Sequence, residues 1–340
     1  MKPALTTTAI LGLALAATWS ANAQAQITLK VADSFPAGHY VTRYMTKPWM
    51  EEVTEKTGGK VKFEHYPAEQ LGKLKDMLML AQSGVTDIAY VVPSIVPDKM
   101  PLSPVAELPL PEAVGCNGAM AYYKVVNQNS QLRRLDFEAN KVRPILVQNL
   151  PPYQVFTGKQ INGLKDLQGM KIRVTGSAKA AVMERLGSVP VQIPTPEVRE
   201  ALSRGTVDGI MFVYSSLFPY DLHPLVKTAT TDLNFGGWIS AYLISEAKWN
   251  ALPADVQEIM TTLGEKYTRR NCELVMQDDA KDRDRLVQGG TKLLQLSAEE
   301  KAEFASKTAD VAEKWAADLD KRGRAGSAVL KEYREALKAN

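Results

Sequence analysis

The amino-acid sequence predicts an α/β protein built from two similar lobes. Residues 169–213 alternate short apolar strands with short helices, which predicts a parallel sheet with its ligands bound beyond the carboxyl ends of the strands. Residues 83–92 repeat the pattern of residues 204–213, a helix stopped by glycine with an aspartate three residues later and an apolar strand after it. Two such units favour two lobes that face each other across a ligand.

Hydrophobic spacing and turn residues predict the elements in order. Strands are expected at 26–31, 61–66, 88–92, 142–149, 171–174, 191–193, 209–213 and 238–245. Helices are expected at 40–57, 70–83, 117–138, 179–186, 197–204 and 253–288, with two polar covering helices in 298–337. The segments 142–149 and 230–237 are expected to cross between the lobes. A helix over 253–288 would be about 50 Å long and would span both lobes.

Several motifs resemble one family over nearly the whole chain. They are Pro67-Ala68-Glu69-Gln70-Leu71-Gly72, Asp166-Leu167-Gln168-Gly169-Met170-Lys171-Ile172-Arg173-Val174, Val207-Asp208-Gly209 and Lys248-Trp249-Asn250-Ala251-Leu252-Pro253-Ala254-Asp255-Val256-Gln257. In order and spacing they resemble the DctP-type solute-binding proteins of TRAP transporters. The resemblance implies a periplasmic binding protein-like fold with crossing hinge strands and a long helix spanning both lobes. We expect lobe I to comprise 26–149 plus about 237–275, and lobe II 150–236 plus about 276–340.

Arg173 is the main candidate for ligand binding. It lies near the carboxyl end of a predicted strand, where an arginine can grip an anion, although most arginines at such edges form surface ion pairs. The resemblance implies the first role, because the family's arginine at this position pairs with the carboxylate of the ligand.

Departures from the family pattern indicate an apolar ligand body. Tyr153 stands where sialic-acid-type members carry a second arginine, and Phe212 stands where many members carry an asparagine that bonds the ligand. With Trp238 and Tyr214 these side chains predict aromatic walls, which favour a monocarboxylate with an aromatic or apolar body. Tyr214 could equally be an ordinary core residue.

The loop 33–39 offers two further candidates, Phe35 and His39. His39 could donate a hydrogen bond to a ligand oxygen, or it could only cap a helix or satisfy its own loop.

The N-terminus is typical of an exported protein. Lys2, an apolar run over 9–19 and the small residues of 21–25 predict a signal peptide over 1–25, hence a periplasmic location. In that compartment the two cysteines, Cys116 and Cys272, either form a disulfide or remain two buried thiols. A net charge of +3 with interspersed signs gives no indication of nucleic-acid binding.

The expected function is capture of an organic acid in the periplasm, hinge closure around it and delivery to a membrane permease. The resemblance implies small and large integral-membrane subunits driven by an ion gradient. A ligand of the short 2-oxo acid, 2-hydroxy acid or C4-dicarboxylate class, a sensor subunit, and a binding protein of another transporter class are alternatives.

An α/β enzyme is a weaker alternative, because phosphate-loop and nucleophile-elbow motifs are absent from the sequence. Asp87 and Asp208 could be paired carboxylates, but each follows a glycine stop and is better explained as a turn or cap residue. We expect no cofactor and no metal site.

Overall fold

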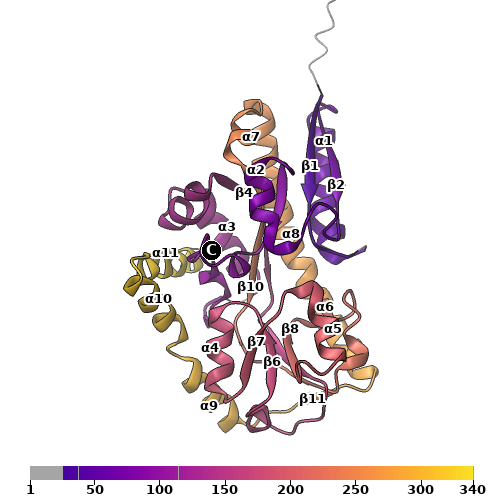
Figure 1. Ribbon diagram of the computed structural model, residues 1–340, viewed down its shortest axis with the longest axis vertical. Coiled ribbons are helices and arrows are strands. Elements are labelled where there is room, and N and C mark those ends of the chain that lie inside the picture. The colour runs from indigo at the N-terminus through magenta and orange to yellow at the C-terminus, as the bar shows by residue number, and fades with distance from the viewer. Residues whose placement is uncertain (1–25, 37, 114, 340) are drawn as a thin grey trace, which may run out of the picture.

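The computed structural model describes residues 26–36, 38–113 and 115–339, and they form two sheets covered by helices (Figure 1). The predicted signal peptide, residues 1–25, lies outside the described residues. The helices are α1 Lys47–Lys56, α2 Met77–Ser83, α3 Asn117–Asn127, α4 Ser177–Arg185, α5 Val198–Ser203, α6 Tyr214–Leu217, α7 Glu246–Asn250, α8 Ala254–Gln288, α9 Ala298–Thr308, α10 Val311–Lys321 and α11 Gly326–Lys338. Within these ranges no helix combines the length and apolar character needed to cross a bilayer.

The first sheet, called sheet A, has the strand order β2-β1-β3-β10-β4. Strand β1 is parallel to both of its neighbours, whereas β10 is antiparallel to β3 and β4. Strands β3, β4 and β10 are almost wholly buried, as expected for strands covered on both faces. The bounds are β1 Ile27–Ala32, β2 Val61–Tyr66, β3 Ile88–Val91, β4 Val142–Leu150 and β10 Trp238–Ser245.

The second sheet, sheet B, has the order β11-β9-β5-β8-β6-β7. In Figure 1 strands β6, β7, β8 and β11 occupy the lower half of the molecule, below the strands β1 and β2 of sheet A. Strand β6 lies parallel between β7 and β8. The bounds are β5 Gln154–Thr157, β6 Lys171–Val174, β7 Val189–Gln192, β8 Gly209–Phe212, β9 Thr228–Thr230 and β11 Lys292–Leu294.

Two segments connect the sheets. The return crossing lies where the sequence predicted it, whereas the predicted crossing strand 142–149 stays in sheet A as β4 and the chain crosses only after it. The chain passes from β4 to β5 through residues 151–153, and from β9 back to β10 through residues 231–237. The two segments meet where the Tyr153 N–H donates to the Gly236 carbonyl over 2.8 Å. Gly236 has a φ of +98°, and a Cβ there would collide with the Glu107 carbonyl. This junction therefore requires glycine.

The predicted echo between the halves is a structural repeat. The Asp87 carboxylate accepts the N–H of Lys30 in the neighbouring strand β1, and the Asp208 carboxylate accepts the N–H of Lys171 at the start of β6, both over 2.8 Å. Each aspartate thus fixes the register of two parallel strands, which agrees with its interpretation as a turn residue.

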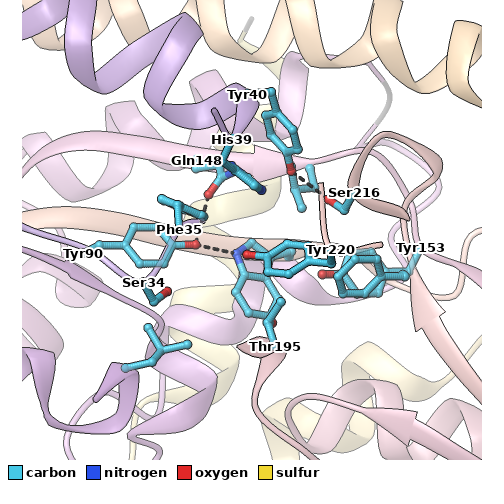
Figure 2. A pocket seen from close by; sticks show the side chains of 14 residues that line it. Ser34, Phe35, His39, Tyr40, Tyr90, Gln148, Tyr153, Thr195, Ser216 and Tyr220 are labelled. Atoms are coloured by element: carbon cyan, nitrogen blue, oxygen red, sulfur yellow. Dashed lines mark hydrogen bonds between the residues drawn. The ribbon is translucent and has the colours of Figure 1, made fainter. Parts of the chain in front are cut away.

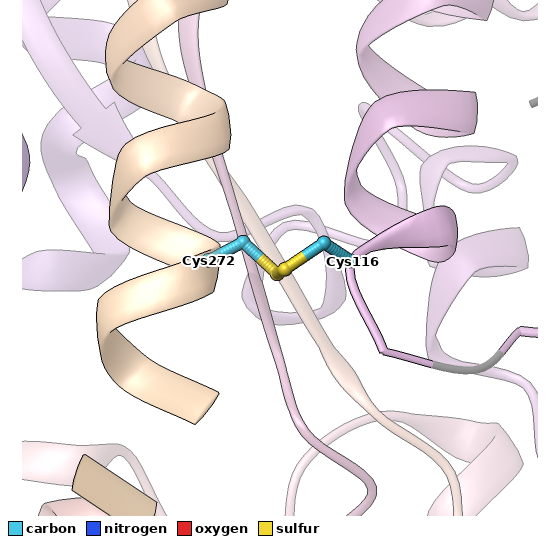
Figure 3. Close-up of a disulfide and its surroundings, with 2 residues drawn as sticks. All are labelled: Cys116 and Cys272. Carbon is cyan, nitrogen blue, oxygen red and sulfur yellow. A yellow bond between two sulfur atoms is a disulfide. The ribbon is translucent and has the colours of Figure 1, made fainter. Parts of the chain in front are cut away.

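Helix α8 extends along both sheets, as predicted. Its 35 residues give a length of about 52 Å, and it packs against β4, α1 and α3 on one side of the junction and against α6 on the other. A disulfide between Cys116 and Cys272, with Cα atoms 5.7 Å apart, joins α8 to the start of α3 (Figure 3).

Three predicted helical segments differ from the structure. Segment 298–337 forms three helices rather than two, with Gly323 at a φ of +70° ending the second. In segment 117–138 the α-helix α3 ends at Asn127. In segment 70–83 the α-helix begins only at Met77, because the Glu69 carboxylate holds the Leu74 N–H in a preceding turn. Helix α11 packs on α3.

Candidate functional site

A small cavity of about 20 Å³ lies at the junction of the two sheets (Figure 2). Its wall combines the loop after β1, the ends of β3, β4, β8 and β10, and the segments that follow β7 and β8. The lining residues are Ser34, Phe35, His39, Tyr40, Leu74, Tyr90, Gln148, Leu150, Tyr153, Thr195, Phe212, Ser216, Tyr220 and Trp238. The cavity is therefore closed by residues from both halves of the chain.

Aromatic rings dominate this wall, since eight of the 14 lining side chains carry one. Tyr153 and Trp238 stack with ring centroids 6.4 Å apart and planes 10° from parallel, and Phe212 lies 6.1 Å from Tyr153. No lining residue is an aspartate, glutamate, lysine or arginine. Such a wall suits a flat, apolar ligand body.

Arg173 lies behind this wall on β6, with 0% of its surface exposed. Alternation along β6 buries Ile172 and Val174 on one face of the sheet and points Arg173 to the other. Its Nε donates to the Ile193 carbonyl over 2.8 Å and its Nη1 to the Met211 carbonyl over 3.3 Å.

The guanidinium also contacts two cavity-lining residues. Its Nη2 donates to the Thr195 hydroxyl over 3.0 Å, and its Cζ lies 5.4 Å from the centroid of the Phe212 ring. The Thr195 bond and the two bonds to backbone carbonyls together use three of the five N–H donors of the guanidinium. Two donors remain for the Tyr153 hydroxyl and a ligand.

Arg173 keeps its charge in this buried place. Burial lowers the pKa of Arg173 to about 10, opposed by the nearby hydroxyls of Tyr153 and Tyr220, so the group is cationic at neutral pH. Its hydrogen-bond acceptors in the described part of the chain are neutral oxygens, and none of the ion pairs found there includes it. A buried cation without a carboxylate is costly, and an anionic ligand would offset that cost.

His39 is a neutral imidazole in the cavity wall. It stacks on Phe35 with ring centroids 4.3 Å apart, and burial lowers its pKa to about 3, helped by the nearby charge of Arg43. Its Nδ1 accepts the Val41 N–H over 3.2 Å, which leaves the proton on Nε2. The two roles suggested for His39 are therefore compatible. Its Nδ1 accepts a bond from its own loop, while the proton on Nε2 can be donated to a ligand oxygen.

Sequence reasoning missed a polar network on the sheet A side. The Tyr90 hydroxyl donates to Gln148 Oε1 over 3.0 Å, and the Trp238 indole N–H donates to the Tyr90 hydroxyl over 3.2 Å. Ser240 adds a third bond, to Gln148, over 3.0 Å. These residues come from three adjacent strands, so only the strand order brings them together.

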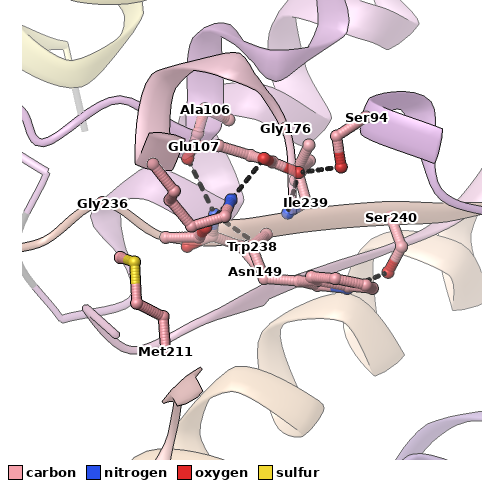
Figure 4. A network of polar contacts seen from close by, with 12 residues as sticks. Ser94, Ala106, Glu107, Asn149, Gly176, Met211, Gly236, Trp238, Ile239 and Ser240 are labelled. Carbon is pink, nitrogen blue, oxygen red and sulfur yellow. Dashed lines mark hydrogen bonds and ion pairs between the residues drawn. The ribbon is translucent and has the colours of Figure 1, made fainter. Parts of the chain in front are cut away.

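Sequence reasoning also missed a buried ion pair beside the cavity. Lys179 on α4 pairs with Glu107, which ends the 3-10 helix Ser103–Glu107, and both side chains are 0% exposed. Lys179 Nζ donates to the Gly237 carbonyl over 2.8 Å and lies 5.5 Å from the centroid of the Tyr153 ring. Figure 4 shows Glu107 among Ser94, Gly176 and Ile239.

Tyr214 corrects the predicted wall, because it does not line the cavity. Its hydroxyl bonds the Thr230 carbonyl, and its ring meets Phe156 edge-on with centroids 4.9 Å apart. It follows β8 by two residues and is buried in the core. The other predicted residues, Phe35, His39, Tyr153, Phe212 and Trp238, do line the cavity.

Metal ligands do not gather anywhere in the described ranges, where no three His, Cys, Asp or Glu side chains are placed to hold an ion.

Comparisons with known proteins place these features in a family context. Residues 31–318 match the family model DctP, described as bacterial extracellular solute-binding protein, family 7. A TRAP solute-binding protein from Rhodoferax ferrireducens T118, solved with copurified benzoate, has a TM-score of 0.84 at 26% identity, over 92% of this chain and 98% of that one. The C4-dicarboxylate-binding periplasmic protein DctP of Rhodobacter capsulatus is 27% identical over 302 residues, 80% of each chain. A Bordetella bronchiseptica TRAP protein solved with mandelate shares the fold, with a TM-score of 0.81 at 24% identity, over 92% of this chain and 99% of that one.

Proposed function

This chain belongs to the DctP family of bacterial extracellular solute-binding proteins, and on that premise we propose that it captures a monocarboxylate with an aromatic or apolar body for a TRAP transporter. The proposed role is binding and delivery rather than catalysis.

The buried charge of Arg173 carries this proposal. Its guanidinium is 0% exposed and bonded to neutral oxygens, and two of its contacts, Thr195 and Phe212, line the cavity. A ligand carboxylate in the cavity would supply the missing negative charge. Losing such a buried Arg–carboxylate pair costs about 2–5 kcal/mol, or roughly 30-fold to several-thousand-fold in affinity.

The aromatic wall supports the proposed ligand body. Tyr153, Trp238 and Phe212 present ring faces and edges to the cavity, while the His39 N–H and the Tyr153 hydroxyl offer hydrogen bonds to a carboxylate. The Rhodoferax relative, solved with benzoate at 26% identity, supports the same class of ligand.

A C4-dicarboxylate is the second candidate, because the Rhodobacter relative is named for that ligand. A second ligand carboxylate would need a second free cation. Lys179, a second buried cation at this junction, is already paired with Glu107. We therefore favour the monocarboxylate.

Export and transfer complete the proposal. Residues 1–25 would direct the chain to the periplasm, and the closed, ligand-bound form would deliver its ligand to small and large integral-membrane subunits of a permease. N-terminal sequencing of protein from a periplasmic fraction tests the first point, because an intact Met1 would contradict it.

Thermal shift of ligand-stripped protein tests the ligand class. Benzoate, mandelate, pyruvate and succinate are compared, and a true ligand at a hundred times its dissociation constant adds about 2.7 kcal/mol of stability. We expect a shift with benzoate or mandelate that Arg173→Met abolishes. Arg269→Met is the matched control, because Arg269 is an exposed arginine of α8 whose partner, Glu265, is exposed as well. A shift with succinate alone would contradict the proposal.

A further inference from the structure

The Glu107–Lys179 ion pair and Arg173 form one buried group of charges. The positive charge of Arg173 contributes to lowering the pKa of Lys179, after burial, while Glu107 raises it. Glu107 also raises the pKa of Arg173, against the effect of burial. The three charges therefore act on one another through the protein interior.

Both charged side chains of the pair are buried, and hydrogen bonds hold each of them in place. The Glu107 carboxylate accepts the Ser94 hydroxyl over 3.0 Å and the Ile239 N–H over 3.4 Å, and its backbone carbonyl accepts the Gly237 N–H over 2.9 Å. Lys179 is held by the Gly237 carbonyl and by the face of the Tyr153 ring, which also lines the cavity. The pair thus lies directly behind the cavity wall.

From this arrangement we infer that Glu107 determines the charge of the ligand, by acting as an internal second carboxylate that neutralises Lys179. The inference rests on the proposed function. Arg173 and Lys179 contribute two positive charges and Glu107 one negative charge, so the group carries +1 and one ligand carboxylate balances it. A dicarboxylate would leave the group with a net negative charge in a medium of low dielectric constant.

Asp33 is another buried carboxylate beside lining residues, and it has partners of its own. Its Oδ2 is bonded to the His65 ring over 2.7 Å and to the Tyr242 hydroxyl over 2.9 Å. Its contribution is common to wild type and to variants of the pair, so it cancels when those are compared.

Four proteins separate the effect of charge from the effect of packing: wild type, Glu107→Gln, Lys179→Met and the double variant. The charges of the group are +1, +2, 0 and +1, respectively. A dicarboxylate carries one more negative charge than a monocarboxylate, so it responds about twice as strongly to each change. For a unit charge several ångströms away in the protein interior, the ratio of the two affinities should change by about 10- to 100-fold.

The experiment measures dissociation constants by calorimetry at pH 7.5 for benzoate, benzene-1,2-dicarboxylate and benzene-1,4-dicarboxylate. We expect Glu107→Gln to shift preference toward a dicarboxylate by at least about tenfold, Lys179→Met to shift it the opposite way, and the double variant to return within about threefold of wild type. Glu112→Gln, which removes a carboxylate paired with Arg334 at the surface, should leave the ratio unchanged.

Other outcomes overturn the inference. If both single variants weaken the binding of all three acids equally, the pair only holds the two halves together and does not select the charge of the ligand. If Glu107→Gln unfolds, the Lys179→Met and double variants still decide, because an unchanged ratio in Lys179→Met contradicts the inference. Failure of the proposed function is distinguishable, because the wild type would then bind none of the three acids.

Discussion

The Arg173 guanidinium and the Thr195 hydroxyl are joined by a hydrogen bond of 3.0 Å from Nη2 to Oγ1. Arg173 lies on β6, whereas Thr195 lies just beyond β7, so the bond spans the carboxyl ends of two neighbouring strands. Because Thr195 lines the cavity, it sets the position of the charge relative to a ligand.

Thr195→Val should therefore weaken benzoate binding. Valine preserves the shape of threonine but removes the acceptor, leaving a buried N–H without a partner and the guanidinium free to turn. We expect a loss of about 1–1.5 kcal/mol, or roughly 5- to 10-fold in affinity, measured by calorimetry. Thr195→Ser keeps the hydroxyl and is the control. Equal affinities for the valine and serine variants would show that the bond does not position Arg173.

The Cys116–Cys272 disulfide should stabilise the fold substantially, because it links positions 156 residues apart. Replacing both cysteines with serine should lower the free energy of unfolding by about 2–5 kcal/mol, chiefly by releasing the unfolded chain. Urea denaturation of the double variant, and of wild type with and without dithiothreitol, measures the effect. Reductant should not affect the double variant.

His39 should make stability depend on pH. Its pKa is about 3 in the folded protein but about 6.5 in the unfolded chain, so below pH 6.5 only the unfolded state takes up the proton. Stability from this group is complete above pH 6.5 and is lost as the pH falls toward 3. Between pH 6.5 and 4.5 the loss is about 2–3 kcal/mol.

The measurement compares wild type with His39→Gln in urea at pH 7 and pH 4.5. Between pH 7 and pH 4.5 the glutamine variant should lose less unfolding free energy than the wild type. A constant difference would mean that His39 is protonated in the folded state.

Asp208 should stabilise the start of β6 through its bond to the Lys171 N–H. Asp208→Ala removes the acceptor and should cost about 1 kcal/mol of unfolding free energy, while Asp208→Asn retains an oxygen and should cost less. Thermal denaturation of the two variants tests this. Both variants should bind benzoate as the wild type does, because Asp208 lies at the opposite end of β6 from Arg173's guanidinium contacts.

Local patterns predicted eight of the eleven strands of the described residues, the long helix and several cavity residues, but missed the short strands β5, β9 and β11. Strand β10 and helix α8 were predicted because their apolar spacing is continuous and their ends carry clear stop residues. Tyr153 and Phe212 were predicted because they stand where a recognisable pattern carries polar residues, and Trp238 was predicted as a further aromatic residue of the same wall.

Residues that meet only through tertiary structure could not be predicted in this way. Glu107 and Lys179 are 72 residues apart, and each resembles an ordinary surface charge in its own segment. Gln148 and Tyr90 become neighbours only because β10 lies between β3 and β4. Tyr214 was misplaced because helix α6 begins at that residue. The helix points the Tyr214 side chain in a different direction from the one it would have in a continued strand β8.

Helix α8 carries two attachments that bear on movement between the halves. Cys272 fixes it covalently to α3 beside sheet A, and seven residues later Asp279 accepts the Ser215 N–H over 2.9 Å, just after β8 of sheet B. Those seven residues span only about 10 Å of helix. If the halves separate, this short rod must either flex or release Ser215. If the helix bends, the strain in it favours return to the closed form. If the bond between Asp279 and the Ser215 N–H breaks, its loss distinguishes the opened form from the closed one.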